Sequence, residues 1–160
     1  MDHGVLVITL ADALRARGLT LAAAESCTGG LIAAACTSIA GSSDWFERGF
    51  VCYSNAAKMQ MLGVDAALID AHGAVSEPVA RAMAEGALAF SAAHIAVAVT
   101  GIAGPGGAVP GKPVGMVWLA VARRGGACVA ERLQLDGDRA RVREQTVAVA
   151  LRRSIECAES

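Results

Sequence analysis

The sequence has few aromatic side chains, few lysines and no excess of charge of either sign. Aromatic residues make up 4% of the 160 residues, and lysine occurs only at Lys58 and Lys112. The 14 basic residues against 15 acidic residues give a formal net charge of −1. This balance does not favour nucleic-acid binding, which generally requires a basic surface. We therefore expect a small molecule as the partner.

A long uninterrupted hydrophobic run is also absent, although hydrophobic residues make up 54% of the chain and the mean hydropathy is +0.47. The longest stretch without Asp, Glu, Lys or Arg, residues 86–111, is broken by polar residues, glycines and prolines. It predicts a helix, a strand and a loop rather than a membrane span. No basic region precedes the first apolar segment, which argues against a signal peptide. We expect a cytoplasmic protein without membrane association.

Several sequence patterns typical of metal or nucleotide binding are missing. The cysteines are odd in number and show no C-x-x-C spacing, which favours free buried thiols: Cys27, Cys36, Cys52, Cys128 and Cys157. None of the three histidines is placed to serve a nucleophile, so a histidine triad or a metal site has little support. There is no Walker motif and no G-x-G-x-x-G. We expect neither a metal nor a cofactor.

The hydrophobic pattern predicts a single domain over residues 1–160. Helices are expected at 4–17, from 29 to about 41, at 55–62 and 76–92 and from 136 onward, with a helical turn at 64–69. Strands are expected at 20–25, 49–53, 95–100, 114–122 and 127–135, and residues 44–48 form a connector. The nearly continuous apolar run 95–100 indicates a central strand, and the alternation in 127–135 indicates an edge hairpin. The fold class is α/β, a layered fold with a mixed, mostly parallel sheet flanked by helices.

Polar segments follow three of the predicted strands, at 25–30, 53–58 and 100–107. If these strands are parallel neighbours, the segments meet in one crevice at their carboxyl ends. In the first segment, Thr28-Gly29-Gly30 opens a helix whose free N–H groups suit a phosphate or a carboxylate. A simple helix cap formed by Ser26 or Thr28 explains the same residues equally well.

A nucleophile and a base can be assembled from the first two segments. Lys58 lies about one helical turn after Tyr53, and a nearby serine completes a Ser-Tyr-Lys set. A neutral lysine, its pKa lowered by burial, can take a serine proton directly or through a phenol. Ser26 and Ser43 are both candidates for the nucleophile, and Cys27 is a third. Taken alone, Lys58 is explained more simply as a solvated surface lysine.

Arg139 stands at the start of the last predicted helix, where the helix dipole disfavours a cation. This position suggests that its side chain reaches an anion. A solvated arginine beside Asp136 and Asp138 is an adequate alternative.

Five segments in order resemble the carboxy-terminal domain of the competence/damage-inducible protein CinA. They are AESCTGG at 24–30, GSSDWFERG at 41–49, YSNAAK at 53–58, HGAVSEP at 72–78 and TGIAGP at 100–105. The resemblance spans nearly the whole chain. It implies a nicotinamide-nucleotide amidase that hydrolyses nicotinamide mononucleotide to nicotinic acid mononucleotide and ammonia without a metal. It also implies a stand-alone version, because the molybdopterin-binding-like domain of full-length CinA does not precede it here.

The resemblance further implies roles for individual residues. A serine attacks the carboxamide, with Ser43 preferred because Ser26 also shapes the anion cradle. Lys58 with Tyr53 moves protons, and donors near Thr100 hold the oxyanion. Substrate binding is expected from Thr28, Gly29, Gly30, Gly101, Gly104 and Arg139.

Two alternatives to this activity remain at this point. One is a non-catalytic nucleotide-sensing or protein-interaction domain linked to competence or DNA damage, and the other is a different amide substrate in the same site. Retention of Tyr53 and Lys58 together favours the enzyme, because a binding domain has no need of that pair. Members of the family tend to associate, so we also expect a homo-oligomer.

Overall fold

The computed structural model describes residues 2–160 and contains one five-stranded sheet, in the order β2-β1-β3-β4-β5. The strands are β1 (Leu21–Glu25), β2 (Phe46–Val51), β3 (Ile95–Gly101), β4 (Met116–Arg123) and β5 (Cys128–Gln134). The first three are parallel, whereas β4 and β5 pair antiparallel. The predicted α/β class with a mixed sheet is therefore confirmed, with the parallel pairing confined to one end of the sheet.

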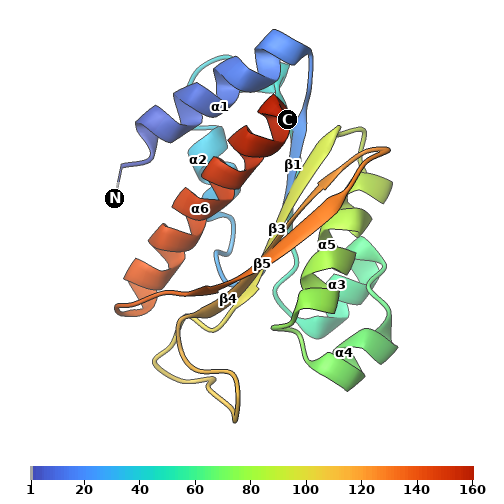
Figure 1. The fold of residues 1–160 in the computed structure, drawn as a ribbon, viewed down its shortest axis with the longest axis vertical. Helices are drawn as coiled ribbons and strands as arrows, with labels where there is room; N and C mark the ends of the chain where they lie inside the picture. Colours follow the sequence, from blue (N-terminus) through green and yellow to red (C-terminus); the bar gives the residue numbers. More distant parts are fainter. Residues whose placement is uncertain (1) are drawn as a thin grey trace.

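Helices cover both faces of this sheet (Figure 1). One face carries α1 (Gly4–Arg17), α2 (Leu31–Cys36) and α6 (Arg139–Glu159). The other carries α3 (Asn55–Leu62), α4 (Ala66–His72) and α5 (Glu77–Ala89). A 3₁₀ turn, η1 (Ser42–Asp44), precedes β2.

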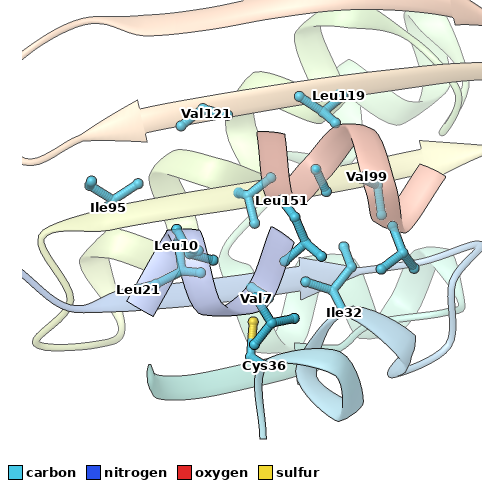
Figure 2. Close-up of a cluster of buried hydrophobic side chains, with 14 of the residues drawn as sticks. Val7, Leu10, Leu21, Ile32, Cys36, Ile95, Val99, Leu119, Val121 and Leu151 are labelled. Carbon is cyan, nitrogen blue, oxygen red and sulfur yellow. The ribbon is translucent and has the colours of Figure 1, made fainter. Parts of the chain in front are cut away.

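The strand β3 separates two hydrophobic clusters. Ile95, Val97 and Val99 face the cluster under α1 and α6, part of which Figure 2 shows. Ala96 and Ala98 face the cluster under α5. All five side chains are fully buried, as the apolar run predicted for a central strand. The carboxyl end of β3 is thus held in a rigid position by packing on both faces.

Two predicted elements have wrong boundaries. The helix expected up to residue 41 ends at Cys36, because Thr37 and Ser38 bond back to the carbonyls of Ala33 and Ala35 through their hydroxyls. The strand expected at 49–53 runs instead from Phe46 to Val51, so part of the predicted connector belongs to it. It is an edge strand, which tolerates the charged pair at 47 and 48 that obscured its start. The other predicted elements are present with slightly shifted ends.

Within the part of the chain that the structure describes, no helix has the length and apolar character needed to cross a membrane.

Candidate functional site

The carboxyl ends of β2, β1 and β3 lie side by side, which is the condition for the three polar segments to meet. A cavity of about 230 Å³ opens there. Its lining comes from the segments after each strand, namely Ser26 and Cys27, then Tyr53, Asn55 and Lys58, then Thr100, Gly101 and Ala103. Ala74 and Val75 complete one wall, and Arg139 contributes from the start of α6. The predicted crevice therefore exists.

Lys58 and Ser26 are in direct contact at the bottom of this cavity. The Lys58 Nζ donates to Ser26 Oγ at 2.9 Å and to the backbone carbonyl of Tyr53 at 2.8 Å. The lysine side chain is 1% exposed, so the simple reading of Lys58 as a surface lysine was wrong. Burial lowers the pKa of its ammonium group from the ordinary value of 10.5. The lowered pKa increases the fraction of Lys58 in the neutral amine form, which can accept the serine proton.

The helix α3 places this lysine. Ser54 caps the helix, accepting a hydrogen bond from the amide of Ala57 at 3.0 Å. Lys58 then falls in the first turn, and its side chain returns over the end of β2 to the Tyr53 carbonyl. A strand end and a capped helix start therefore fix the base relative to Ser26.

Cys27 lies beside Ser26 but is a poor nucleophile. Its side chain is buried, and burial raises the pKa of the thiol to about 12. The reactive thiolate is therefore scarce at neutral pH. Of the two adjacent candidates, only Ser26 contacts a base.

The predicted anion cradle at Thr28-Gly29-Gly30 is already filled by a carboxylate of the protein itself. Glu25 is fully buried and accepts from Thr28 Oγ1 at 2.6 Å and from the amides of Ile32 and Ala33 at 2.8 and 3.0 Å. The first free N–H groups of α2 are consequently occupied, and the phosphate-cradle expectation was wrong for this helix. The two glycines form the turn, with φ of 57° and 108°, which side chains rarely adopt.

Arg143 is a residue that the sequence analysis missed. It projects from α6, and its guanidinium donates to the carbonyls of Cys27 at 3.1 Å and Thr28 at 3.2 Å. The available signal was its spacing, because it lies one helical turn after Arg139 and therefore on the same helix face. The turn after β1 is thus held by Glu25 from within and by Arg143 from α6.

Three backbone N–H groups in this turn, those of Cys27, Thr28 and Gly30, donate no hydrogen bond to another residue among residues 2–160. Thr28 is fully buried and does not line the cavity, whereas Cys27, which immediately follows Ser26 in the chain, does. A backbone amide that lines a cavity next to a nucleophile is the kind of donor that stabilises an oxyanion.

Thr100 lines the cavity, but its hydroxyl proton is used elsewhere. Its Oγ1 donates to the carbonyl of Ala74 at 2.9 Å, which ties the end of β3 to the wall formed by residues 74 and 75. The Thr100 hydroxyl, one of the donors expected near Thr100, therefore already donates within the protein. Gly101 also lines the cavity, and a Cβ there would lie 2.6 Å from Val117, so the glycine is required by strand packing.

Arg139 and Gly104 contact each other at the mouth of the cavity. The Arg139 guanidinium donates to the Gly104 carbonyl at 2.9 Å. Arg139 remains exposed and also borders a second hollow of about 560 Å³ formed with Pro105, Val114 and Gly137. The adjoining hollows share Ala103 and Arg139, so together they offer room for a ligand larger than a single ring.

Tyr53 contributes its backbone rather than its phenol. Its carbonyl accepts from Lys58, whereas its side chain is 63% exposed. No hydrogen bond of the phenol oxygen occurs among the described residues. The geometry therefore gives no route from Ser26 through the phenol to Lys58, which instead contacts Ser26 directly.

The structure does not bring Ser43 to this site. Ser43 is exposed in η1, which precedes β2, and Phe46 at the start of β2 pairs with Leu21 at the start of β1. Because β1 and β2 are parallel, Ser43 lies at the amino end of the sheet and Ser26 at the carboxyl end. The preference for Ser43 over Ser26 is therefore contradicted by the strand direction.

Asn55 is another cavity residue that the sequence analysis assigned no role; it is the first residue of α3. Within residues 2–160 there is no group of three or more His, Cys, Asp or Glu side chains that could hold a metal ion.

The fold and site together define an α/β protein in which a serine at a strand-to-helix turn contacts a buried lysine at the carboxyl edge of the parallel strands. A model of the CinA C-terminal domain matches residues 5–158. The chain belongs to the CinA C-terminal domain family.

Curated relatives of two lengths share this domain. The chain is 55% identical over 140 residues to nicotinamide-nucleotide amidohydrolase PncC of Escherichia coli K12, covering 88% of this chain and 85% of that protein. It is 57% identical over 134 residues to a CinA-like protein of Mycolicibacterium vanbaalenii, covering 84% of this chain but 32% of the relative. The chain spans about a third of the length of such longer relatives.

Solved structures agree with the fold. The crystal structure of competence/damage inducible protein CihA from Agrobacterium tumefaciens has a TM-score of 0.95 at 45% identity, covering 100% of this chain and 97% of that one. A CinA superfamily protein from Escherichia coli has a TM-score of 0.92 at 34% identity, covering 96% of this chain and 89% of that one.

Proposed function

We propose that this protein is a nicotinamide-nucleotide amidase, hydrolysing nicotinamide mononucleotide to nicotinic acid mononucleotide and ammonia. The observation that carries the proposal is the 2.9 Å contact between Ser26 Oγ and the buried Lys58 Nζ in a cavity that Cys27 also lines. The similarity to PncC over most of both chains supports this choice of substrate.

In the first half of the proposed reaction, Ser26 Oγ forms a bond to the carboxamide carbon. Its proton passes to the neutral amine of Lys58, which the short contact makes possible without an intermediary. The carbonyl oxygen becomes an oxyanion held by the backbone amide of Cys27, a residue that lines the cavity. The Lys58 ammonium then returns the proton to the amide nitrogen, and ammonia leaves as the carbon–nitrogen bond breaks.

In the second half, water hydrolyses the ester that remains on Ser26. Lys58 takes a proton from the water as its oxygen attacks the ester carbon, and the serine oxygen leaves with that proton. The product acid loses its proton to solvent, which leaves the carboxylate of nicotinic acid mononucleotide and the free enzyme. Lys58 relays the proton in both halves of the cycle, so a lysine whose pKa is lowered towards the working pH suits both.

Arg139 is the proposed phosphate ligand. It is the exposed cation at the mouth of the cavity, and its guanidinium already lies between the two adjoining hollows. A ring bound near Ser26 would leave its ribose phosphate directed towards this mouth. Guanidinium groups bind phosphate in a bidentate manner, which favours an arginine here.

The deciding experiment measures ammonia released from nicotinamide mononucleotide by the purified protein, with nicotinamide riboside as a matched substrate lacking the phosphate. We expect turnover of the mononucleotide and a much higher KM for the riboside. An intact fold by circular dichroism with saturable binding but no ammonia across neutral pH would instead favour a non-catalytic nucleotide sensor.

We also propose a cytoplasmic homo-oligomer. The edge strand β5 exposes Val129, and the outer strand β2 exposes Val51, so two sheet edges remain available for association. Light scattering over a concentration series tests this, with a monomer at all concentrations as the contrary result.

A further inference from the structure

We propose that Asn55 is a substrate-binding residue that holds the ribose hydroxyls of the mononucleotide. The proposal rests on the function proposed above and names a recognition residue for that same site. Asn55 is the first residue of α3, and it lines the cavity that contains Ser26 and Lys58.

The helix α3 directs Asn55 and Lys58 to the same side. The two residues are three positions apart, a spacing that puts their side chains on one helix face. The Lys58 amine reaches Ser26 in the cavity, so this face is the one turned towards the cavity. Side chains of a helix tilt towards its amino terminus, so Asn55 projects beyond Lys58. Lys58 is fully buried whereas Asn55 is exposed, which places the asparagine nearer the cavity mouth.

The side-chain amide of Asn55 is free to bind a ligand. It bonds to no other residue within residues 2–160. Capping of α3 does not need it, because Ser54 Oγ accepts from the amide of Ala57 and the Ser54 carbonyl accepts from the amide of Lys58. A side-chain amide offers a carbonyl acceptor and two N–H donors. Asn55 therefore presents both kinds of hydrogen-bonding group to the cavity.

Polar side chains deeper in the cavity are already engaged. Ser26 and Lys58 bond to each other, and the Thr100 hydroxyl donates to a backbone carbonyl. The Tyr53 phenol also has no partner within the described residues, but Tyr53 precedes α3, and it is the carbonyl of Tyr53 that meets Lys58. Asn55 is thus the unpaired polar side chain that shares the helix face of the base.

The order of groups in the proposed substrate matches this order of residues. The carboxamide carbon has to reach Ser26 Oγ at the bottom of the cavity, and the phosphate is assigned to Arg139 at the mouth. The ribose lies between these two groups. Each of its hydroxyls can donate and accept a hydrogen bond, which is the combination that an asparagine amide complements. A residue near the mouth with a free amide is therefore suited to the ribose rather than to the reacting carbon.

The test measures ammonia release from nicotinamide mononucleotide and from its 2′-deoxy and 3′-deoxy analogues, each of which lacks one hydroxyl. Asn55→Leu replaces the amide by methyl groups in the same branched shape. We expect it to raise the KM for the mononucleotide by about 5- to 50-fold, as for one or two lost hydrogen bonds, with kcat within about threefold of wild type. The matched control Gln60→Met removes an exposed amide of α3 outside the cavity and should behave as wild type.

The deciding readout is the ratio of KM between a deoxy analogue and the full substrate. In wild type we expect at least one analogue to have a KM about 3- to 30-fold higher. In Asn55→Leu that ratio should fall to about one, because the missing hydroxyl no longer has a partner to lose. A purely structural effect on α3 would raise all three KM values alike and leave the ratio unchanged. Asn55→Ala replaces Asn55→Leu if thermal melts show that the leucine variant is unfolded.

Two results would overturn the proposal. One is a set of KM ratios that are near one in wild type or unchanged in Asn55→Leu. The other is a ratio that falls to about one in Tyr53→Phe instead, because the phenol would then hold the hydroxyls.

Calorimetry separates this proposal from the proposed reaction. If wild type binds nicotinamide mononucleotide but releases no ammonia, the amidase proposal fails. The affinity ratios between the full and deoxy ligands, in wild type and in Asn55→Leu, then still decide the role of Asn55. If wild type binds neither nicotinamide mononucleotide nor nicotinic acid mononucleotide, both proposals fail.

Discussion

The two ends of the parallel strands carry similar residues in very different environments. At the carboxyl end, Ser26 contacts a buried lysine and Glu25 is fully buried with three donors. At the amino end, Ser43 is exposed, and the carboxylate of Asp44 is 67% exposed and only 3.5 Å from an arginine that is itself partly exposed. Serine and carboxylate occur at both ends, and the cavity of about 230 Å³ lies at the carboxyl end.

The difference follows from how a parallel sheet is built. In an open parallel sheet, ligands bind in the crevice outside the carboxyl ends of the strands. This crevice forms where the order of the strands reverses, because the loops on its two sides lead to opposite faces of the sheet. Here β1 is the middle of the three parallel strands, so its carboxyl end is flanked on both sides. Residue type therefore predicts chemistry only together with the direction of the strand that presents it.

The largest expected effect separates the two serines. Ser26→Ala removes the proposed nucleophile and should lower kcat by at least about 10³-fold, in the range seen when a nucleophile is deleted. Ser43→Ala, at an exposed position in η1, should leave kcat and KM unchanged. Ammonia release from nicotinamide mononucleotide measures both. If Ser43→Ala folded normally but lost activity, Ser43 rather than Ser26 would be needed for the reaction.

The second prediction compares the two lysines. Lys58→Met should lower kcat by about 10²- to 10⁴-fold, as expected for loss of a general base. Lys112→Met removes a half-buried lysine that bonds a backbone carbonyl outside the cavity, and it should retain activity.

The pH dependence follows from the same group. Only the neutral amine of Lys58 can accept the serine proton, so kcat/KM should rise with pH and level off above the lysine pKa. Because burial lowers that pKa, the inflection should fall below 10.5 and be absent from the residual activity of Lys58→Met. If kcat/KM of the wild type were still rising at pH 10.5, the pKa of the catalytic base would not be lowered by burial, and the prediction would be contradicted.

The third prediction compares the two carboxylates by stability. Glu25→Gln places an NH₂ group against donors that now bond an oxygen, and it should cost about 1–3 kcal/mol of unfolding free energy. Asp44→Asn breaks an exposed ion pair and should cost less than about 0.5 kcal/mol. Urea unfolding measures both values. Equal costs would mean that the Glu25 bonds do not hold the turn.

Much of the fold and the place of the site could be predicted from sequence. The apolar run of β3 specified a central strand, and polar segments after three strands specified a common crevice, because these features depend on local pattern and on the general topology of parallel sheets. The start of β2 could not be predicted in this way. Its charged residues at 47 and 48 resemble a connector, and their tolerance depends on the strand being at the edge.

The details of the site depended on side-chain geometry. The pattern Thr28-Gly29-Gly30 indicated an anion at the start of α2, but it did not reveal that Glu25 supplies that anion. Likewise, the burial of Lys58 and the reach of Arg143 arise from tertiary packing between segments far apart in the chain. The choice between Ser26 and Ser43 required the strand direction, which spacing does not contain.

The smallest expected effect concerns Tyr53. Its phenol and its position beside the site suggest a role in proton transfer, but the geometry does not support that role. Tyr53→Phe removes only the exposed phenol oxygen and leaves the carbonyl that holds Lys58. We expect kcat within about threefold of wild type, because the proton moves directly between Ser26 and Lys58. The matched variant Ser54→Ala removes the α3 cap instead and should lower stability by about 1 kcal/mol. A kcat loss above about 100-fold in Tyr53→Phe, with unchanged KM, would show that bound substrate draws the phenol into the proton path. The direct contact would then describe only the free enzyme.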